Sequence, residues 1–234
     1  MTSSIAFQSA LEEIEALTLK LFQDEPFHNL YFLYGKEPLS NIYGGTCSDK
    51  TMSFVCAANA LGFDAELHTG YIGGKEIHRL CRVIIEKRVF FADVGNGWPS
   101  LKLYPADEEI SFTNFGIKYR TVINNNWVSV FQTRYGKEFL QLEIDPAPRK
   151  KEEVEKSISQ RFSSGIEYPF CNSLRFSLVV KNKFLFLRGE RLEIYTENGC
   201  SIVDGIRREL VPRVLNEQFQ YDSTALFKYL TGMK

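Results

Sequence analysis

The stretch Tyr43-Gly44-Gly45-Thr46-Cys47-Ser48-Asp49 decides how this chain is interpreted. Thr46 followed three residues later by Asp49 is typical of a capping box at a helix start, and the helix is expected to run to about Leu61. Cys47 then lies in the first helical turn, where backbone N–H groups and the helix dipole favour its thiolate. The motif alone also fits a plain loop-to-helix junction that carries a small buried residue. Residues elsewhere in the chain must therefore decide between the two interpretations.

A histidine and an aspartate follow in a predicted β-hairpin. His78 belongs to the run Ile77–Ile85 and Asp93 to the run Val89–Val94, with a turn between them. A loop of two or four residues places both on the same sheet face, and side chains can bridge one diagonal step of about 7–8 Å. A three-residue loop without a bulge places them on opposite faces. If they meet, Cys47, His78 and Asp93 have the chemistry of a nucleophile, a base and an orienting carboxylate.

Two other histidines are alternative bases for the cysteine. His28 and His68 have no carboxylate that local geometry places beside them. The sequence therefore favours His78 without excluding the other two.

The composition excludes several classes of function. The chain has 234 residues, and its 28 Lys+Arg balance 29 Asp+Glu, so no basic surface for nucleic acid is expected. The apolar runs are shorter than the roughly 20 residues of a membrane span, and the first residues do not resemble a signal peptide. The five cysteines show no CxxC spacing, so we expect neither a disulfide framework nor a metal site. These features favour a reducing, cytoplasmic setting.

The order of predicted elements is helical, then β, then mixed. A helix is expected over Ser4–Gln23, irregular chain from Asp24 to Gly45, and charged linker after Asp145. Predicted strands are Ala65–Ile72, Ile77–Ile85, Val89–Val94, Lys118–Asn124, Trp127–Thr133, Phe139–Glu143, Arg175–Val180, Phe184–Arg188 and Leu192–Tyr195. Later helices are expected at Lys151–Arg161, Gly205–Phe219 and Ser223–Leu230. This order predicts an α+β protein with a small antiparallel sheet or barrel in the middle.

Four segments together resemble the arylamine N-acetyltransferases. They are Pro26-Phe27-His28-Asn29-Leu30, Gly44-Gly45-Thr46-Cys47, His78 with Asp93-Val94-Gly95-Asn96-Gly97, and Pro169-Phe170-Cys171-Asn172-Ser173-Leu174. The chain looks like a divergent member whose N-terminal lobe is short. Where the family usually has Arg before the two glycines, this chain has Tyr43. Asp49 and Thr51 replace a usual Glu and Asn, and Asn96 replaces a usual aromatic residue.

The resemblance implies a three-lobed fold with a papain-like or transglutaminase-like Cys-His-Asp core. The lobes are a helical lobe over residues 1–64 that carries the nucleophile, an antiparallel β-barrel over residues 65–145 that carries His78 and Asp93, and a linker with an α/β lid over residues 146–234.

The resemblance also implies the site and its substrates. Acetyl-coenzyme A would acylate Cys47 as co-substrate, and a small-molecule amine would then take the acyl group in a ping-pong reaction. Phe27, Asn96 and Phe170 would line the acceptor pocket, and Gly95 and Gly97 would let the backbone approach the coenzyme. Asn96 offers hydrogen bonds in place of ring stacking, so a more polar acceptor is expected.

Two other functions remain open at this stage. The same triad would serve a cysteine hydrolase or a transglutaminase-like enzyme, in which water or a protein amine is the acceptor. An inactive homologue that only binds ligands is the third hypothesis. Reactivity of Cys47 and acylation by acetyl-coenzyme A separate the three.

Overall fold

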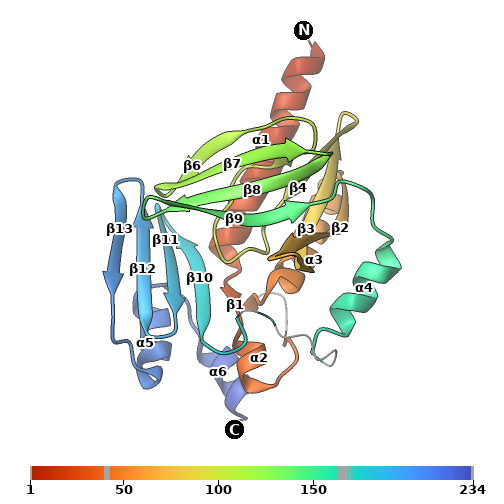
Figure 1. Ribbon diagram of the computed structural model, residues 1–234. Helices are drawn as coiled ribbons and strands as arrows, with labels where there is room; N and C mark the ends of the chain where they lie inside the picture. The colour runs from red at the N-terminus through yellow and green to blue at the C-terminus, as the bar shows by residue number, and fades with distance from the viewer. Residues whose placement is uncertain (1, 40–42, 163–167, 169, 233–234) are drawn as a thin grey trace.

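The computed structural model describes residues 2–39, 43–162, 168 and 170–232, and it has an α+β architecture with two antiparallel sheets (Figure 1). The α-helices are α1 (Thr2–Asp24), α2 (Leu30–Tyr34), α3 (Cys47–Ala60), α4 (Lys151–Ser159), α5 (Val211–Glu217) and α6 (Thr224–Thr231). The α+β class predicted from the sequence is confirmed.

The larger sheet curls into a half-barrel in the middle of the molecule (Figure 1). Its eight strands run in the order β5-β4-β3-β2-β9-β8-β7-β6. They are β2 (Asp64–Ile72), β3 (Lys75–Ile85), β4 (Arg88–Ala92), β5 (Tyr104–Pro105), β6 (Ser111–Asn114), β7 (Ile117–Asn124), β8 (Trp127–Arg134) and β9 (Lys137–Ile144). The sequence predicts a sheet or barrel here, and the observed sheet is a half-barrel that begins at β5 and ends at β6.

The smaller sheet joins segments that lie far apart in the sequence. Its order is β1-β10-β11-β12-β13, in which β1 (Phe27–His28) pairs antiparallel with β10 (Arg175–Val180). The other strands are β11 (Lys183–Arg188), β12 (Arg191–Thr196) and β13 (Gly199–Val203). The first and last predicted lobes therefore share a sheet.

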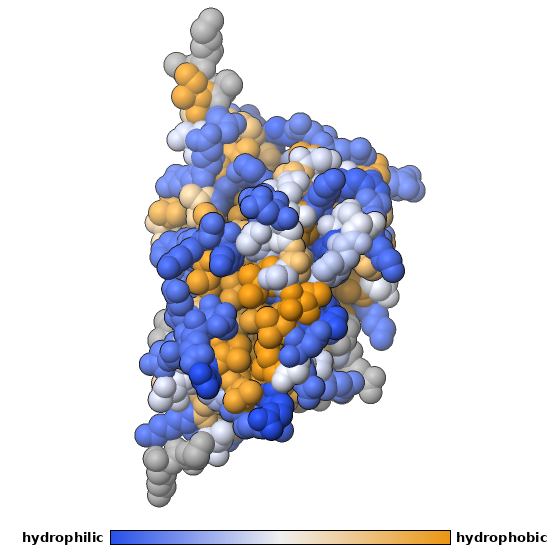
Figure 2. All heavy atoms as spheres, turned by 90° about the vertical axis from the view of Figure 1, so that its left-hand side faces the viewer, coloured by the Kyte–Doolittle hydropathy of each residue, from blue (hydrophilic) through white to orange (hydrophobic). Residues whose placement is uncertain are grey.

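Side-chain alternation gives the smaller sheet two buried faces. Phe176, Leu185 and Leu187 pack with side chains of α2, α5 and α6 on one face. Phe184 and Phe186 point to the opposite face, where they pack with Trp98 and residues of the half-barrel. The period of two that strands impose thus places the sheet between the helices and the half-barrel. The edge strand β13 is more exposed, and Figure 2 shows hydrophobic side chains among hydrophilic ones on this side of the molecule.

The hairpin that carries His78 and Asp93 has the two-residue loop that places both on one face. Ile85 pairs with Arg88, and Glu86 and Lys87 have φ values of 46° and 73°. Positive φ at both central residues is the signature of a type I′ turn.

Two predictions about element boundaries are wrong. The stretch expected to be irregular contains β1 and α2, because Phe27 and His28 pair with a strand about 150 residues later that no local pattern reveals. The helix expected over Gly205–Phe219 begins only at Val211, after a 3₁₀ turn over Arg208–Leu210. Pro212 explains this start, because proline favours the first helical turn and lacks an N–H for an interior position.

Asn29 fastens the start of β10 to the N-terminal region. Its side-chain Nδ2 donates to the carbonyls of Phe170 and Ser173, the latter at 2.7 Å, and its Oδ1 accepts from the Arg175 N–H at 2.8 Å. The Asn29 side chain is fully buried, so water cannot replace these partners. One buried amide therefore joins three backbone groups of the segment that carries Phe170 and Arg175, next to the β1–β10 pairing.

We predict that Asn29→Ala lowers the free energy of unfolding by about 3 kcal/mol, because three buried groups lose partners worth about 1 kcal/mol each. Urea unfolding measures the change. Asn59→Ala is the matched control, since the exposed Asn59 also makes three side-chain bonds, to Val55 and Ala65. If both variants lost the same free energy of unfolding, burial would not explain the contribution of Asn29.

Candidate active site

Cys47 is the first residue of α3, as the sequence predicts. Thr46 is the N-cap, and the Asp49 carboxylate accepts from the Thr46 N–H at 2.9 Å and from its hydroxyl at 3.1 Å. The thiol is only 6% exposed, but it lines a pocket. The capping box therefore presents the sulfur at the positive end of a helix.

His78 and Asp93 meet behind the cysteine. In the hairpin register Cys81 faces Ala92, so His78 and Asp93 lie one diagonal step apart. His78 Nε2 lies 2.6 Å from Asp93 Oδ1, and both side chains are almost completely buried. Because Asp93 occupies Nε2, Nδ1 is the ring nitrogen left to act on the Cys47 sulfur.

The electrostatics favour a thiolate–imidazolium pair. Burial alone would raise the pKa of Cys47, but the hydrogen bond and charge of His78 outweigh it, so the pKa lies below its usual value. Burial would likewise lower the pKa of His78, but the charge and hydrogen bond of Asp93 raise it to about 10. Each shift has the sign that a nucleophilic cysteine requires.

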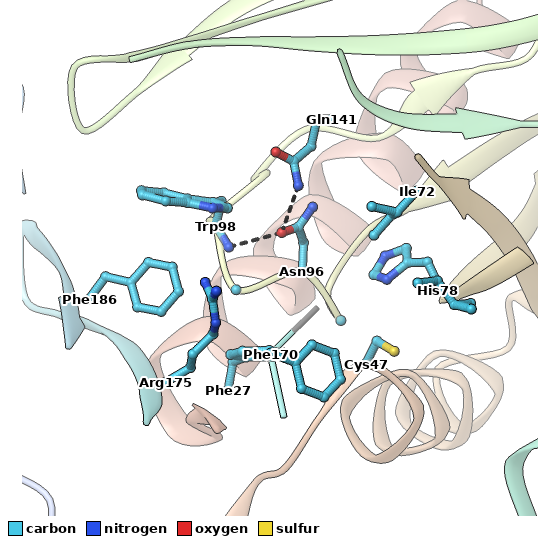
Figure 3. A pocket seen from close by; sticks show the side chains of 13 residues that line it. Phe27, Cys47, Ile72, His78, Asn96, Trp98, Gln141, Phe170, Arg175 and Phe186 are labelled. Carbon is cyan, nitrogen blue, oxygen red and sulfur yellow. Dashed lines mark hydrogen bonds between the residues drawn. The ribbon is translucent and has the colours of Figure 1, made fainter. Parts of the chain in front are cut away.

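Asn96 supports Asp93, a role that the sequence does not reveal. Its Nδ2 donates to Asp93 Oδ2 at 3.0 Å, and its Oδ1 accepts from the Trp98 N–H at 3.2 Å (Figure 3). Gln141 of β9 also donates to Asn96 Oδ1, at 3.3 Å. The amide of Asn96 is thus held within the protein, although the residue also lines the pocket.

One pocket contains almost all of the residues that the sequence analysis selects. Its volume is about 210 Å³, and it is open to solvent. Seven of the eight selected residues line it, namely Phe27, Cys47, His78, Gly95, Asn96, Gly97 and Phe170, and Asp93 lies behind His78. The pocket therefore offers a substrate direct access to the sulfur and to several aromatic rings.

The two glycines are in close contact with protein atoms. A Cβ on Gly95 would lie 2.7 Å from both Cα and Cβ of Cys47 and 2.8 Å from the Arg79 carbonyl oxygen. A Cβ on Gly97 would meet the rings of Phe186 and Phe27 at 3.1 and 3.2 Å. Packing therefore requires glycine at position 95, and at position 97 it leaves room for a side chain only if the two rings shift by a few tenths of an ångström.

The competing histidines have other roles. His28 Nε2 lies 2.8 Å from the Tyr43 carbonyl oxygen and His68 Nε2 lies 2.9 Å from that of Asp145, so each ring donates to backbone. Burial lowers the pKa of both rings to about 4. Both are neutral structural groups.

Six further pocket residues were not selected from the sequence as substrate-binding, namely Ile72, Ile77, Trp98, Gln141, Arg175 and Phe186. Phe186 and Gln141 lie in strands that looked like ordinary core and surface. Arg175 could have been selected from the sequence, because it follows directly after the Pro169–Leu174 motif. Pro169 itself lies outside the described residues.

Comparison with known proteins identifies the family. A family model described as N-acetyltransferase matches residues 10–225. The chain belongs to the arylamine N-acetyltransferase family. It is therefore an acyltransferase, as the sequence predicts. No curated protein sequence matches the chain.

Solved arylamine N-acetyltransferases share the fold. The enzyme from Salmonella typhimurium superposes with a TM-score of 0.78 at 17% identity, over 96% of this chain and 92% of its own. That from Nocardia farcinica gives 0.77 at 22% identity, over 95% and 88%. A complex of the Mycobacterium marinum enzyme with CoA gives 0.78 at 15% identity, over 92% and 88%. The predicted arylamine N-acetyltransferase-like fold is confirmed.

Two departures from the usual family motif keep structural contacts around Cys47. Asp49 caps α3 and also pairs with Arg161 at 2.7 Å. The Thr51 hydroxyl donates to the Arg79 carbonyl at 3.0 Å, which holds α3 against the strand that carries His78. Asp49 and Thr51 therefore both help to fix the start of α3.

Two negative observations concern only the described part of the chain. Within it, no three His, Cys, Asp or Glu side chains cluster in a way that would hold a metal ion. No helix in that part is both long and apolar enough to cross a membrane.

We predict that iodoacetamide alkylates Cys47 at a nearly constant rate between pH 6 and 8. The lowered pKa of Cys47 and the raised pKa of His78 keep the ion pair across this window. An ordinary thiol, with a pKa of about 8.5, reacts about tenfold faster per pH unit there. Peptide mapping by mass spectrometry measures the rates, with N-acetylcysteine as the reference. A Cys47 rate that rises in parallel with the reference, or an equally fast exposed Cys56, would contradict the assignment.

Proposed function

We propose that Cys47 carries an acetyl group from acetyl-coenzyme A to an amine, with His78 as the base and Asp93 as its orienting carboxylate. The observation that carries the proposal is the buried Cys47–His78–Asp93 array at the wall of a pocket that small molecules can enter. Membership of the arylamine N-acetyltransferase family supports acyl-coenzyme A as the donor. The CoA bound in the similar Mycobacterium marinum structure supports it further.

The first half-reaction transfers the acetyl group to the enzyme. The Cys47 thiolate attacks the thioester carbonyl, the carbon–sulfur bond to coenzyme A breaks, and the departing thiolate takes the proton of the His78 imidazolium. The helix start beside Cys47 and its lowered pKa support this role.

The second half-reaction transfers the acetyl group to the acceptor. The amine nitrogen attacks the Cys47 thioester, neutral His78 takes its proton, and the carbon–sulfur bond breaks to restore the thiolate–imidazolium pair. The Asp93 carboxylate stabilises the imidazolium in both steps. Phe27 and Phe170, whose ring centroids lie 6.3 Å apart at 89°, provide an aromatic wall for the acceptor.

Free thiols support a reducing, cytoplasmic setting for this reaction. All five cysteines, at positions 47, 56, 81, 171 and 200, are unpaired. Proteins of oxidising compartments more often pair them.

The decisive experiment is the mass of the protein after mixing with acetyl-coenzyme A. We expect an increase of one acetyl group on the Cys47 peptide, and loss of this increase when an arylamine is added. Cys47→Ala should abolish both the increase and turnover. An acetyl group on another cysteine, or no acetyl group on the intact protein, would overturn the proposal.

We predict a graded loss of activity in two variants behind the nucleophile. Asp93→Asn should lower kcat by about 10⁴-fold, because an amide can leave the imidazole in the wrong tautomer. Asn96→Ala removes one hydrogen bond to the carboxylate and should lower kcat only about tenfold. Steady-state kinetics with acetyl-coenzyme A and an arylamine measure both. If Asp93→Asn lost less than Asn96→Ala, Asp93 would not orient the base.

A further inference from the structure

Arg175 places a positive charge in the acceptor pocket. It is the first residue of β10, and its guanidinium extends into the pocket on the side of Trp98 and Phe186, across from Cys47 (Figure 3). The backbone of Arg175 is fixed by Asn29, which bonds to its N–H at 2.8 Å and its carbonyl at 3.2 Å. The backbone from which the Arg175 side chain extends is therefore fixed.

This charge has no counter-charge among the described residues. Arg175 Nε is buried without a hydrogen-bond partner there, and none of the ion pairs in that part of the chain involves Arg175. Burial and the like charge of Arg188 lower the pKa of Arg175. A half-buried guanidinium without a partner is unfavourable, so an anion that enters the pocket gains from pairing with it.

The strand register places a second arginine directly opposite Arg175, which makes an anion beside Arg175 more favourable. Arg175 lies directly opposite Arg188 on β11, and like charges at such positions destabilise a sheet. Arg188 is neutralised by Glu193, which is almost fully buried and also accepts from the Tyr195 hydroxyl. The pair therefore keeps one uncompensated positive charge, and it is the one that faces the pocket.

The rest of the lining is aromatic or neutral. Phe27, Phe170, Phe186 and Trp98 provide ring surfaces, and no described residue of the lining is Asp or Glu. A flat ring that carries an anionic group matches this combination of apolar walls and one planar cation.

We propose that Arg175 binds a carboxylate carried by the acyl acceptor, so that the preferred acceptors are aromatic amines with a carboxylate on the ring. This inference rests on the proposed acetyl transfer through Cys47. The carboxylate would orient the ring so that its amine reaches the Cys47 thioester, and the planar guanidinium fork suits a carboxylate better than an ammonium group would.

The test compares acceptors in the second half-reaction alone. Preformed acetyl-enzyme is mixed with 2-, 3- or 4-aminobenzoate and with the corresponding uncharged aminobenzamides. For the best isomer, Arg175→Met should slow transfer to the aminobenzoate about tenfold to a hundredfold and leave the aminobenzamide nearly unchanged. The ratio between the two proteins cancels the intrinsic reactivity of each amine. Arg175→Lys should fall between them, and Arg120→Met, which alters an exposed arginine paired with Glu138, should change nothing.

Acylation rates with two acyl donors test whether Arg175 instead binds an anionic group of the coenzyme or of the acyl chain. Equal slowing of acylation by acetyl- and succinyl-coenzyme A in Arg175→Met, with acceptor ratios unchanged, would assign the arginine to the coenzyme. Slowing with succinyl-coenzyme A alone would assign it to the acyl chain. Either result overturns the proposal, and so does an unchanged acceptor ratio in variants that melt at the wild-type temperature.

A binding measurement keeps the inference separate from the proposed function. Benzoate should slow alkylation of Cys47 by iodoacetamide in the wild-type protein at least tenfold more effectively than in Arg175→Met, and benzamide should not distinguish the two. This readout needs no acetyl transfer. Absence of an acetyl-enzyme together with this protection would therefore overturn only the proposed function, and equal protection in both proteins would overturn only the role of Arg175.

Discussion

The close approach of Gly95 to Cys47 is the constraint on which the site depends. A side chain on Gly95 would lie 2.7 Å from the backbone of Cys47, less than any real contact allows. The start of α3 and the end of the hairpin can touch only because this side chain is absent. Thr51 of α3 also joins the helix to the hairpin, because its hydroxyl donates to the carbonyl of Arg79, the residue after His78. Any wider spacing would separate the sulfur from the imidazole.

A chain of hydrogen bonds connects β9 of the half-barrel to the imidazole of His78. Gln141 of β9 donates to Asn96, Asn96 donates to Asp93, and Asp93 pairs with His78, whose charge helps to lower the pKa of Cys47. A carboxylate that is 1% exposed is tolerated only when donors satisfy it, and Asp93 has the imidazole on one oxygen and an amide on the other. The raised pKa of His78 follows from this arrangement, because the buried carboxylate favours the protonated ring.

Local sequence patterns predicted the parts of the site that depend on local structure. The capping box at Thr46 and the hairpin between His78 and Asp93 are both encoded within about fifteen residues, and both formed as expected. Pairing of β1 with β10 was missed because it joins residues about 150 positions apart. Gln141 was missed for the same reason, since its partner Asn96 lies 45 residues away and nothing in either segment indicates the other.

The structure gives Asn96 contacts that the sequence analysis did not foresee. The sequence analysis expected a polar acceptor because an amide replaces an aromatic ring at this position. In the structure that amide bonds to Asp93, Trp98 and Gln141, so little of its polarity is left for a ligand. The uncompensated polar group that remains in the pocket is the guanidinium of Arg175, which a different strand provides. Arg175 therefore replaces Asn96 as the residue that would select a polar acceptor. A guanidinium would select an acceptor that carries an anion, whereas an amide would select one that carries a neutral hydrogen-bonding group.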